Sequence, residues 1–554
     1  MANVKFSKKL FEKEIGTLNE QMQTKIAMFG TTLESINAEE DEIELEIFPD
    51  RPDLLSYQGF KRAFLAFLGK STGLKPYKVN KPEKNYQVKV DSSVEKVRPF
   101  TACAIVKGLK LDDEKIKEII DIQEKLHNTV GRKRKKLAIG IYPLEKITLP
   151  ITYKALEPDK IRFTPLEMDR ELNGLQILQR HPTGRDYAHL LSGKSKFPIF
   201  IDAKKRILSM PPIINSQLTG KITEKTKDVF IECSGFDLDI LKKSLNIIIT
   251  TFADMSSSVK IYQMNVKYRK TEITPNLAPE THKISLENTN KLLGLNLNEK
   301  QLKQCLEKMG HSYGKSSKSS RTVQTPSWRV DILHEVDLIE DVAIAYGYDN
   351  FKPEIPEIST LGSENPVESI KRKISEILAG LGMLEVSNFH LTNKKDQFTK
   401  MGISEKQEKG FIELEESKTD YTILRKDLTH YLLKNLSENV DAEYPQKIFE
   451  IGRVFNSNLE ESENLAIALA PGNFTEIKQA LEYLSKMANQ KIYLEEAKDA
   501  PGHFIDGRTA RIKLGEKQIG FLGEIHPKIL KNWRIKMPTA LLEINLKEIF
   551  ENLI

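Results

Sequence analysis

The stretch "PSWRVDILHEVDLIEDVAIAYGY" (residues 326–348) gathers five carboxylates within eleven positions and then continues as an apolar run. A helix that begins near Asp337 would project Asp337, Glu340 and Asp341 from one face, because residues three and four apart are neighbours on a helix. Asp331 precedes this helix and could fold back over the same face. The pattern therefore predicts a concentrated patch of negative charge at a helix start.

Two interpretations of this patch remain open from the residues alone. Carboxylates in a first helical turn cap free N–H groups and suit the helix dipole, at about 0.3–1 kcal/mol each. Three carboxylates on one face also repel one another, and hard oxygen ligands are those that Mg²⁺ selects. The patch is either decoration of a helix start or a site for a divalent cation.

The whole chain has the composition of a folded protein with several domains. Its 554 residues carry a formal net charge of +6, which by itself demands no nucleic-acid partner. At roughly 100–200 residues per domain, about three to five domains are expected. Its three cysteines lie far apart, with neither metal-type nor disulfide-framework spacing, which fits a reducing compartment. We find no signal peptide and no run of about 18 apolar residues, so we expect a cytoplasmic protein with no membrane partner.

The first 268 residues have the pattern of two mixed α and β domains, expected at 1–92 and 93–268. In the first, we expect a strand at 41–49, a helix within 50–69 and a polar linker at 71–92. In the second, we expect strands at 100–109, 136–144, 198–210 and 228–235, and helices at 113–131 and 236–256.

Two further domains are expected at 269–352 and 360–554. In the first, the stretch 295–310 offers Asn298 as N-cap and Gln301 at the spacing of a capping box, with Gly310 ending the helix, and 314–321 is a polar loop. In the second, the patterns predict an antiparallel sheet flanked by helices. Its helices are expected near 367–382, 427–438 and 475–489, and its strands near 384–391, 447–455, 465–470, 508–513, 517–522 and 540–545.

Several segments, in order, resemble the phenylalanyl-tRNA synthetase β-subunit family of the archaeal and eukaryotic type. The opening stretch resembles the end of the family's B5 domain. The family's N-terminal domain has a counterpart in "EIFPDRPDLLSYQGFKRAFLAFLG", which resembles it. Two stretches resemble the B3/B4 editing region: "GRKRKKLAIGIYPLEKI" and "ILSMPPIINSQLTGKITEKTKDVFIECSG". Two further stretches resemble the catalytic-like domain that closes the subunit: "FEIGRVF" and "GFLGEIHPKILKNWRI".

The resemblance implies an α+β multidomain fold with an N-terminal α/β domain, a B3/B4 editing domain and a small, winged-helix-like B5 domain. A class II synthetase-like antiparallel sheet domain without its own active site would follow. It also implies attachment of L-phenylalanine to tRNA(Phe) with ATP, in an α₂β₂ heterotetramer whose α subunit holds the aminoacylation site. The family's Mg²⁺ carboxylates match Asp331, Asp337, Glu340 and Asp341, beside a subunit interface.

The resemblance further implies a hydrolytic site for mischarged tyrosyl-tRNA, with an editing pocket that includes Ser209, Asn215, Glu232 and Ser234. The archaeal pattern has Asp and Thr where Glu232 and Ser234 stand, which changes the size of the pocket. A strand carboxylate on the solvent face is the alternative for Glu232.

A basic run, from Arg132 to Lys136, is the densest positive stretch of the chain. It precedes a strand, so it is either a solvated loop or a contact for the phosphates of the tRNA acceptor arm. Its members are Arg132, Lys133, Arg134, Lys135 and Lys136.

Two rival functions are compatible with parts of the pattern: a stand-alone RNA-binding scaffold and a Mg²⁺-dependent hydrolase. The hydrolase would need a Gly-rich loop that cradles phosphate, and neither GxxxxGK[ST] nor GxGxxG is present. The scaffold would need no partner subunit, so copurification with an α subunit separates it from the synthetase interpretation.

Overall fold

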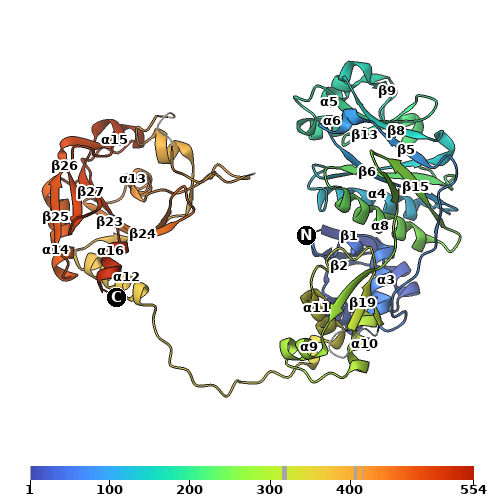
Figure 1. Cartoon of the computed structure of the whole chain (residues 1–554), viewed down its shortest axis with the longest axis horizontal. Helices are drawn as coiled ribbons and strands as arrows, with labels where there is room; N and C mark the ends of the chain where they lie inside the picture. Colours follow the sequence, from blue (N-terminus) through green and yellow to red (C-terminus); the bar gives the residue numbers. More distant parts are fainter. Residues whose placement is uncertain (1, 315–320, 405–408, 416, 554) are drawn as a thin grey trace. The chain divides into compact units, whose positions relative to one another are not determined.

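The structure, a computed structural model of the chain, describes residues 2–553 apart from 315–320, 405–408 and 416. The chain forms two compact units, Met1–Ile355 and Pro356–Ile554 (Figure 1). Within the described residues, no helix combines the length and apolar character needed to cross a membrane.

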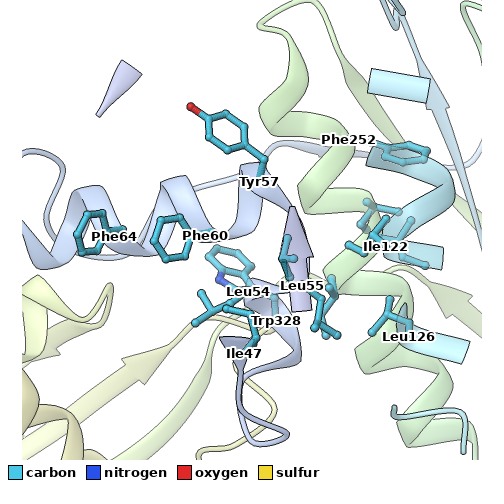
Figure 2. Packing of buried hydrophobic residues seen from close by; sticks show 14 of the residues in the cluster. Ile47, Leu54, Leu55, Tyr57, Phe60, Phe64, Ile122, Leu126, Phe252 and Trp328 are labelled. Atoms are coloured by element: carbon cyan, nitrogen blue, oxygen red, sulfur yellow. The ribbon is translucent and has the colours of Figure 1, made fainter. Parts of the chain in front are cut away.

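The N-terminal part of the first unit is a three-stranded antiparallel sheet covered by an aromatic helix. Strand β3 (Glu42–Ile47) lies between β1 (Ala2–Ser7) and β2 (Thr32–Asn37), and its alternating burial matches the predicted strand. Helix α3 (Tyr57–Phe67) buries Phe60 and Phe64 in this core. Figure 2 shows these two rings along α3, with Trp328 from a distant part of the chain beneath them.

The middle part of the first unit is built on one large sheet with the path β13-β12-β11-β8-β5-β15-β6-β14-β7, so β7 is an edge strand. Helices α4 (Asp113–Asn128) and α8 (Leu238–Met255) pack against the β6-β14-β7 side of this sheet. The strands are β5 (Gln87–Val90), β6 (Phe100–Lys107), β7 (Leu137–Pro143), β8 (Ile151–Leu156), β11 (Phe197–Ile201), β12 (Ile207–Met210), β13 (Ile214–Asn215), β14 (Val229–Gly235) and β15 (Lys260–Lys267).

Two expectations for this region were wrong. The expected linker at 71–92 contains β4 (Val79–Asn80) and β5, because both pair in parallel with β15, far along the chain. The expected strand at 198–210 is the hairpin of β11 and β12, since Asp202 accepts from Arg206 and a turn forms between them. In both cases the deciding partner lies outside the local sequence pattern.

The last part of the first unit combines a small sheet with three helices. The sheet order is β17 (Glu280–Ile284), β19 (Arg321–Thr325) and β18 (Ser312–Gly314). Helices α9 (Leu286–Leu293) and α10 (Glu299–Lys308) connect β17 to β18, and α11 (Glu335–Tyr346) follows β19. The predicted capping box of Asn298 and Gln301 is present at α10. Most of the polar loop expected at 314–321 lies outside the described residues.

The second unit is a seven-stranded sheet of order β20-β23-β24-β28-β27-β26-β25, antiparallel except for the β20–β23 pair. Apolar clusters cover both of its faces, which explains the near-continuous apolar run of β24. The predicted helices are α12 (Pro366–Gly380), α13 (Thr429–Glu438) and α14 (Phe474–Met487). The strands are β20 (Leu384–Glu385), β23 (Gln446–Phe455), β24 (Glu461–Ala470), β25 (Ile492–Glu496), β26 (Phe504–Leu514), β27 (Lys517–Ile525) and β28 (Ala540–Asn545).

Candidate functional site

A cavity of about 400 Å³ lies beside the edge strand β7, between α4 and the segment that joins β12 to α7 (Gln217–Gly220). Ser209, Asn215 and Glu232 line it, so three of the four predicted pocket residues come together from β12, β13 and β14. Apolar side chains complete its wall: Ile116, Ile119, Ile139, Ile141, Pro212 and Ile213. A buried polar group inside a largely apolar cavity is typical of a ligand site.

The three polar residues meet at Tyr142, which the sequence did not single out. Tyr142 Oη lies 2.7 Å from Ser209 Oγ, 3.2 Å from Glu232 Oε1 and 3.4 Å from Asn215 Oδ1. Its one hydroxyl hydrogen serves one acceptor at a time, so the other contacts need donors of their own. The local signal was a tyrosine next to the end of the otherwise apolar strand "LAIGIYP".

Gly140 makes room for this polar group. It pairs with Glu232 across β7 and β14, and Tyr142 follows two residues later on the same face. A Cβ atom at Gly140 would approach Tyr142 Oη to 2.1 Å and Glu232 Oε1 to 2.6 Å. Only glycine leaves these two side chains where they are.

Glu232 is an acid held in a nearly dry environment. It is 2% exposed, so the alternative of a solvent-facing strand carboxylate is wrong. Burial raises its pKa to about 8, against the opposing effects of the Arg98 charge and of the nearby Tyr142 and Ser234 hydroxyls. Its Oε2 atom is buried and has no hydrogen-bond partner in the described part of the chain. That oxygen is free for a ligand.

Ser234, the fourth predicted pocket residue, does not line the cavity. Among the described residues it is buried behind the cavity, where its Oγ accepts from Arg98 Nε at 3.3 Å and its carbonyl from Arg98 Nη2 at 2.7 Å. Arg98 also donates to the carbonyls of Arg134 and Lys135, each at 3.4 Å. Ser234 thus helps to anchor the guanidinium that fixes the neighbouring basic loop.

The basic run forms a tight turn at the cavity. Arg132, Lys133 and Arg134 have φ of 45°, 53° and 63°, a left-handed conformation that is uncommon outside glycine. Arg134 points inward, donating to Ile213 O at 2.8 Å and to Glu124 Oε1 at 2.7 Å, while the other four basic residues are exposed. Arg134 therefore ties the turn to the cavity wall.

His127 lines the cavity but has both ring nitrogens engaged. Its Nε2 accepts from the Ile139 N–H at 2.8 Å, and its Nδ1 lies 3.2 Å from Glu124 Oε1. Burial would raise the pKa of Glu124, but hydrogen bonds and charges from His127 and Arg134 outweigh it and lower that pKa to about 2. With Gln123 Nε2 donating to Ile139 O, these α4 side chains close the open edge of β7.

Part of the negative charge of the acidic patch (residues 331–341) is compensated by Arg329 and by backbone N–H groups at the start of α11. Helix α11 begins at Glu335, two residues earlier than expected, and Asp337 Oδ2 caps it by accepting from Leu333 N and His334 N at 2.7 Å. Buried Arg329 lies 2.6 Å from Asp331 Oδ2 and 2.8 Å from Asp341 Oδ2.

Glu340 is the one member of the patch left open to solvent. Burial, and then the charges of Asp341, Asp50, Asp337 and Asp331, raise its pKa, so negative charge there is not fully compensated. Carboxylate oxygens whose negative charges still repel one another are suitable ligands for a hard divalent cation. In the described residues, however, no three His, Cys, Asp or Glu side chains converge closely enough to hold an ion, so no complete ligand cage is formed.

Comparison with known proteins places these features in a family. Residues 85–268 match the B3/4 domain, residues 282–348 the tRNA synthetase B5 domain, and residues 352–546 the phenylalanyl tRNA synthetase beta chain CLM domain. The phenylalanine–tRNA ligase beta subunit of Archaeoglobus fulgidus is 37% identical over 542 residues, which cover 98% of this chain and 97% of the relative. The chain belongs to the phenylalanine–tRNA ligase beta-subunit family.

Other members of the beta-subunit family agree. The relative from Pyrococcus furiosus is 38% identical over 513 residues, 90% of each chain. An N-terminal fragment of the phenylalanyl-tRNA synthetase beta subunit from Pyrococcus horikoshii superimposes with a TM-score of 0.59 at 36% identity, covering 62% of this chain and 99% of that fragment. The expected α+β multidomain fold is confirmed, and neither rival function is favoured.

Exchange of Glu232 for glutamine in this beta-subunit family member tests the buried acid. Between the ordinary pKa of 4.5 and about 8, the folded chain keeps a proton that the unfolded chain has released, so wild-type stability falls as pH rises across this window. Glu232→Gln lacks the titrating group and should be more stable than wild type above this window, by on the order of 5 kcal/mol.

Urea unfolding of the first unit at about pH 4.5 and about pH 8.5 measures the difference. We expect the two proteins to be nearly equal at the lower pH and to separate at the higher one. A stability difference that is the same at both pH values would show that Glu232 does not hold a proton in the folded chain.

Proposed function

We propose that this chain is the beta subunit of a phenylalanine–tRNA ligase and that its B3/4 cavity hydrolyses tyrosyl-tRNA(Phe) formed in error. The observation that carries the proposal is Glu232 Oε2, a buried polar atom without a partner in the described residues, in the wall of a 400 Å³ cavity. In this proposal an α subunit and ATP complete the α₂β₂ enzyme that joins L-phenylalanine to tRNA(Phe).

Discrimination between the two amino acids is a physical need of such an enzyme. A pocket shaped for a phenyl ring rejects an added hydroxyl by only about a hundredfold. A second site that requires the hydroxyl removes the error, because a buried polar group without a partner costs about 1–3 kcal/mol. Glu232 Oε2 would regain a partner from a phenolic hydroxyl and from nothing on a phenyl ring.

Different residues of the cavity would contact the hydroxyl and the ring of the tyrosyl ester. Tyr142 holds Glu232 Oε1, and this leaves Oε2 directed to the hydroxyl of the bound side chain. Ile139 and Pro212 supply apolar wall for the ring. Water then adds to the ester carbonyl, the bond to the ribose oxygen breaks, and that oxygen takes the proton, which yields tyrosine and free tRNA. His127 has no free nitrogen to act as the base, so the cavity contributes chiefly orientation.

The carboxyl-terminal unit supports the assignment of aminoacylation to the partner. On its sheet lies a cavity of about 350 Å³ whose described lining includes Asp427, His503 and Glu543 but neither lysine nor arginine. A triphosphate needs cationic groups. We propose that ATP is bound by the α subunit and that this unit serves as a class II-like scaffold. We propose domain limits at 1–92, 93–268, 269–352 and 360–554, with β4 and β5 as strands that the end of the first segment contributes to the sheet of the second.

The editing proposal is tested with the chain assembled with its α subunit by co-expression. Glu232→Ala should slow hydrolysis of tyrosyl-tRNA(Phe) at least about tenfold, because it removes the carboxyl oxygen that would meet the phenolic hydroxyl. Glu224→Ala, at an exposed side chain, serves as the matched control and should keep the wild-type rate. Phenylalanine-dependent ATP–pyrophosphate exchange should appear only in the assembled protein.

Wild-type hydrolysis by Glu232→Ala would remove this residue from the site. Clear exchange activity of the beta chain alone would overturn the division of labour between the subunits.

The exposed part of the basic turn is our proposed binding surface for tRNA phosphates. Arg132, Lys133, Lys135 and Lys136 are exposed, and Arg134 fixes the turn beside the cavity into which the aminoacyl end would enter. Replacing Arg132 and Lys133 by glutamine should lower the slope of log affinity against log salt by about one for each phosphate that the variant no longer neutralises. Exchange of the exposed Lys204 and Lys205 on another turn provides the control. A slope unchanged by the first pair would favour a merely solvated loop.

We also propose a Mg²⁺ ion at the acidic patch, with Glu340 as the first protein ligand and Asp331, Asp337 and Asp341 beside it. Support comes from the uncompensated charge at Glu340, while Arg329 and the α11 cap already occupy oxygens of the other three. A bound ion there would neutralise this face of α11 near a subunit contact.

Magnesium titration of the assembled enzyme by calorimetry tests this ion. Glu340→Gln should weaken binding at least about tenfold, since it removes the most available hard ligand. The exposed Asp349→Asn lies just beyond α11 and should bind as wild type does. If Glu340→Gln bound Mg²⁺ as tightly as wild type, the acidic side chains would serve only to stabilise the start of α11.

A further inference from the structure

A second cavity, of about 140 Å³, lies in the first unit between α3 and the part that follows α10. Five cationic residues but only two carboxylates, Asp53 and Asp254, line it. The cationic residues are Arg51, Lys61, Arg62, Lys75 and Arg329.

The three arginines can be compared by what their Nε and Nη2 atoms bind. These two donors are parallel and form the fork that matches two oxygens of an oxyanion. The fork of Arg51 holds Asp53, with Nε–Oδ1 at 2.8 Å and Nη2–Oδ2 at 2.9 Å. The fork of Arg329 holds Asp331, with Nε–Oδ1 at 2.9 Å and Nη2–Oδ2 at 2.6 Å.

The fork of Arg62 is empty. Its Nη1 donates to Asp254 Oδ2 at 2.7 Å and to Tyr77 Oη at 3.1 Å, but its Nε and Nη2 are buried and find no acceptor in the described part of the chain. The side chain is only 8% exposed, and its guanidinium lies 4.6 Å from the ring centroid of Trp328. Trp328 is itself buried and lies close to α3 (Figure 2).

The charges around the fork favour an anion. Asp254 is shared between Arg62 and Lys75, at 2.7 Å from each. Lys61 pairs with Glu14, which does not line the cavity, and Arg329 with Asp331 and Asp341, which do not line it either. Arg51, Lys61 and Arg329 thus each have a carboxylate partner, whereas Arg62 and Lys75 share one, so a single positive charge remains uncompensated close to the two unused, parallel donors.

We infer that this cavity binds a phosphate group, with two of its oxygens on the Nε and Nη2 atoms of Arg62 and the side chains of Lys61 and Lys75 nearby. A tetrahedral oxyanion suits both the volume and the surplus charge better than a neutral ligand. The group would link α3 to the segment that carries Trp328 and Arg329. The inference does not depend on the editing proposal, because none of these residues lines the B3/4 cavity.

Equilibrium dialysis of the full chain with radiolabelled inorganic phosphate, at constant ionic strength in chloride, measures the site. We expect saturable binding of one phosphate per chain. Arg62→Lys keeps the charge but removes the fork, and should weaken binding at least about tenfold. Arg269→Lys, at a side chain 93% exposed, is the matched control and should bind as wild type does.

Absence of saturable binding to the wild-type chain, or equal affinity in Arg62→Lys, would overturn the inference. Should Arg62→Lys fail to fold, a crystal structure of the wild-type chain grown with phosphate decides: density on Nε and Nη2 of Arg62 supports the site, and an empty fork contradicts it. Adenosine monophosphate as a competitor distinguishes the source, since displacement indicates a phosphate ester and its failure indicates the free anion.

Discussion

The carboxyl group of Glu232 is held inside a sheet by the hydroxyl of Tyr142, and the B3/4 cavity depends on this one interaction. With Oε1 engaged at 3.2 Å, the other oxygen is left buried and without a partner in the described residues. A lone polar atom in such a place destabilises the empty chain, and only a ligand that brings a hydrogen-bonding group can restore that stability. The instability of the unpaired oxygen in the empty cavity thus makes the cavity prefer a ligand with a hydroxyl group over one without.

Other features of the cavity maintain this interaction. Gly140 leaves the space that the two side chains occupy, and Ser209 and Asn215 complete the polar group around Tyr142. Arg98, buried behind the wall, joins Ser234 to the basic turn through backbone carbonyls. The same arginine opposes the rise in the pKa of Glu232 without pairing with it directly.

How far the sequence predicts such a site depends on the range of the interactions involved. Strands β7 and β14 were predictable because each is a local apolar run, and the resemblance placed Ser209, Asn215 and Glu232 in one pocket. Tyr142 was not found, because its role arises from residues 67 to 90 positions away that meet only in the folded sheet. Strand β5 was missed for the same reason, and the earlier start of α11 follows from a histidine that caps it. In the acidic patch, helical spacing predicted the shared face, but it carried no sign that buried Arg329 holds two of the carboxylates.

The central claim is that Glu232 is protonated in the folded chain at neutral pH. Carbon-13 NMR of the protein labelled at glutamate side-chain carboxyls measures this directly, with Glu232→Gln to assign the signal. The signal should titrate with a midpoint near the raised pKa of about 8. A midpoint near the ordinary value of 4.5 would contradict the account, because an ionised, well-solvated carboxylate would not carry an unpaired oxygen into a dry cavity.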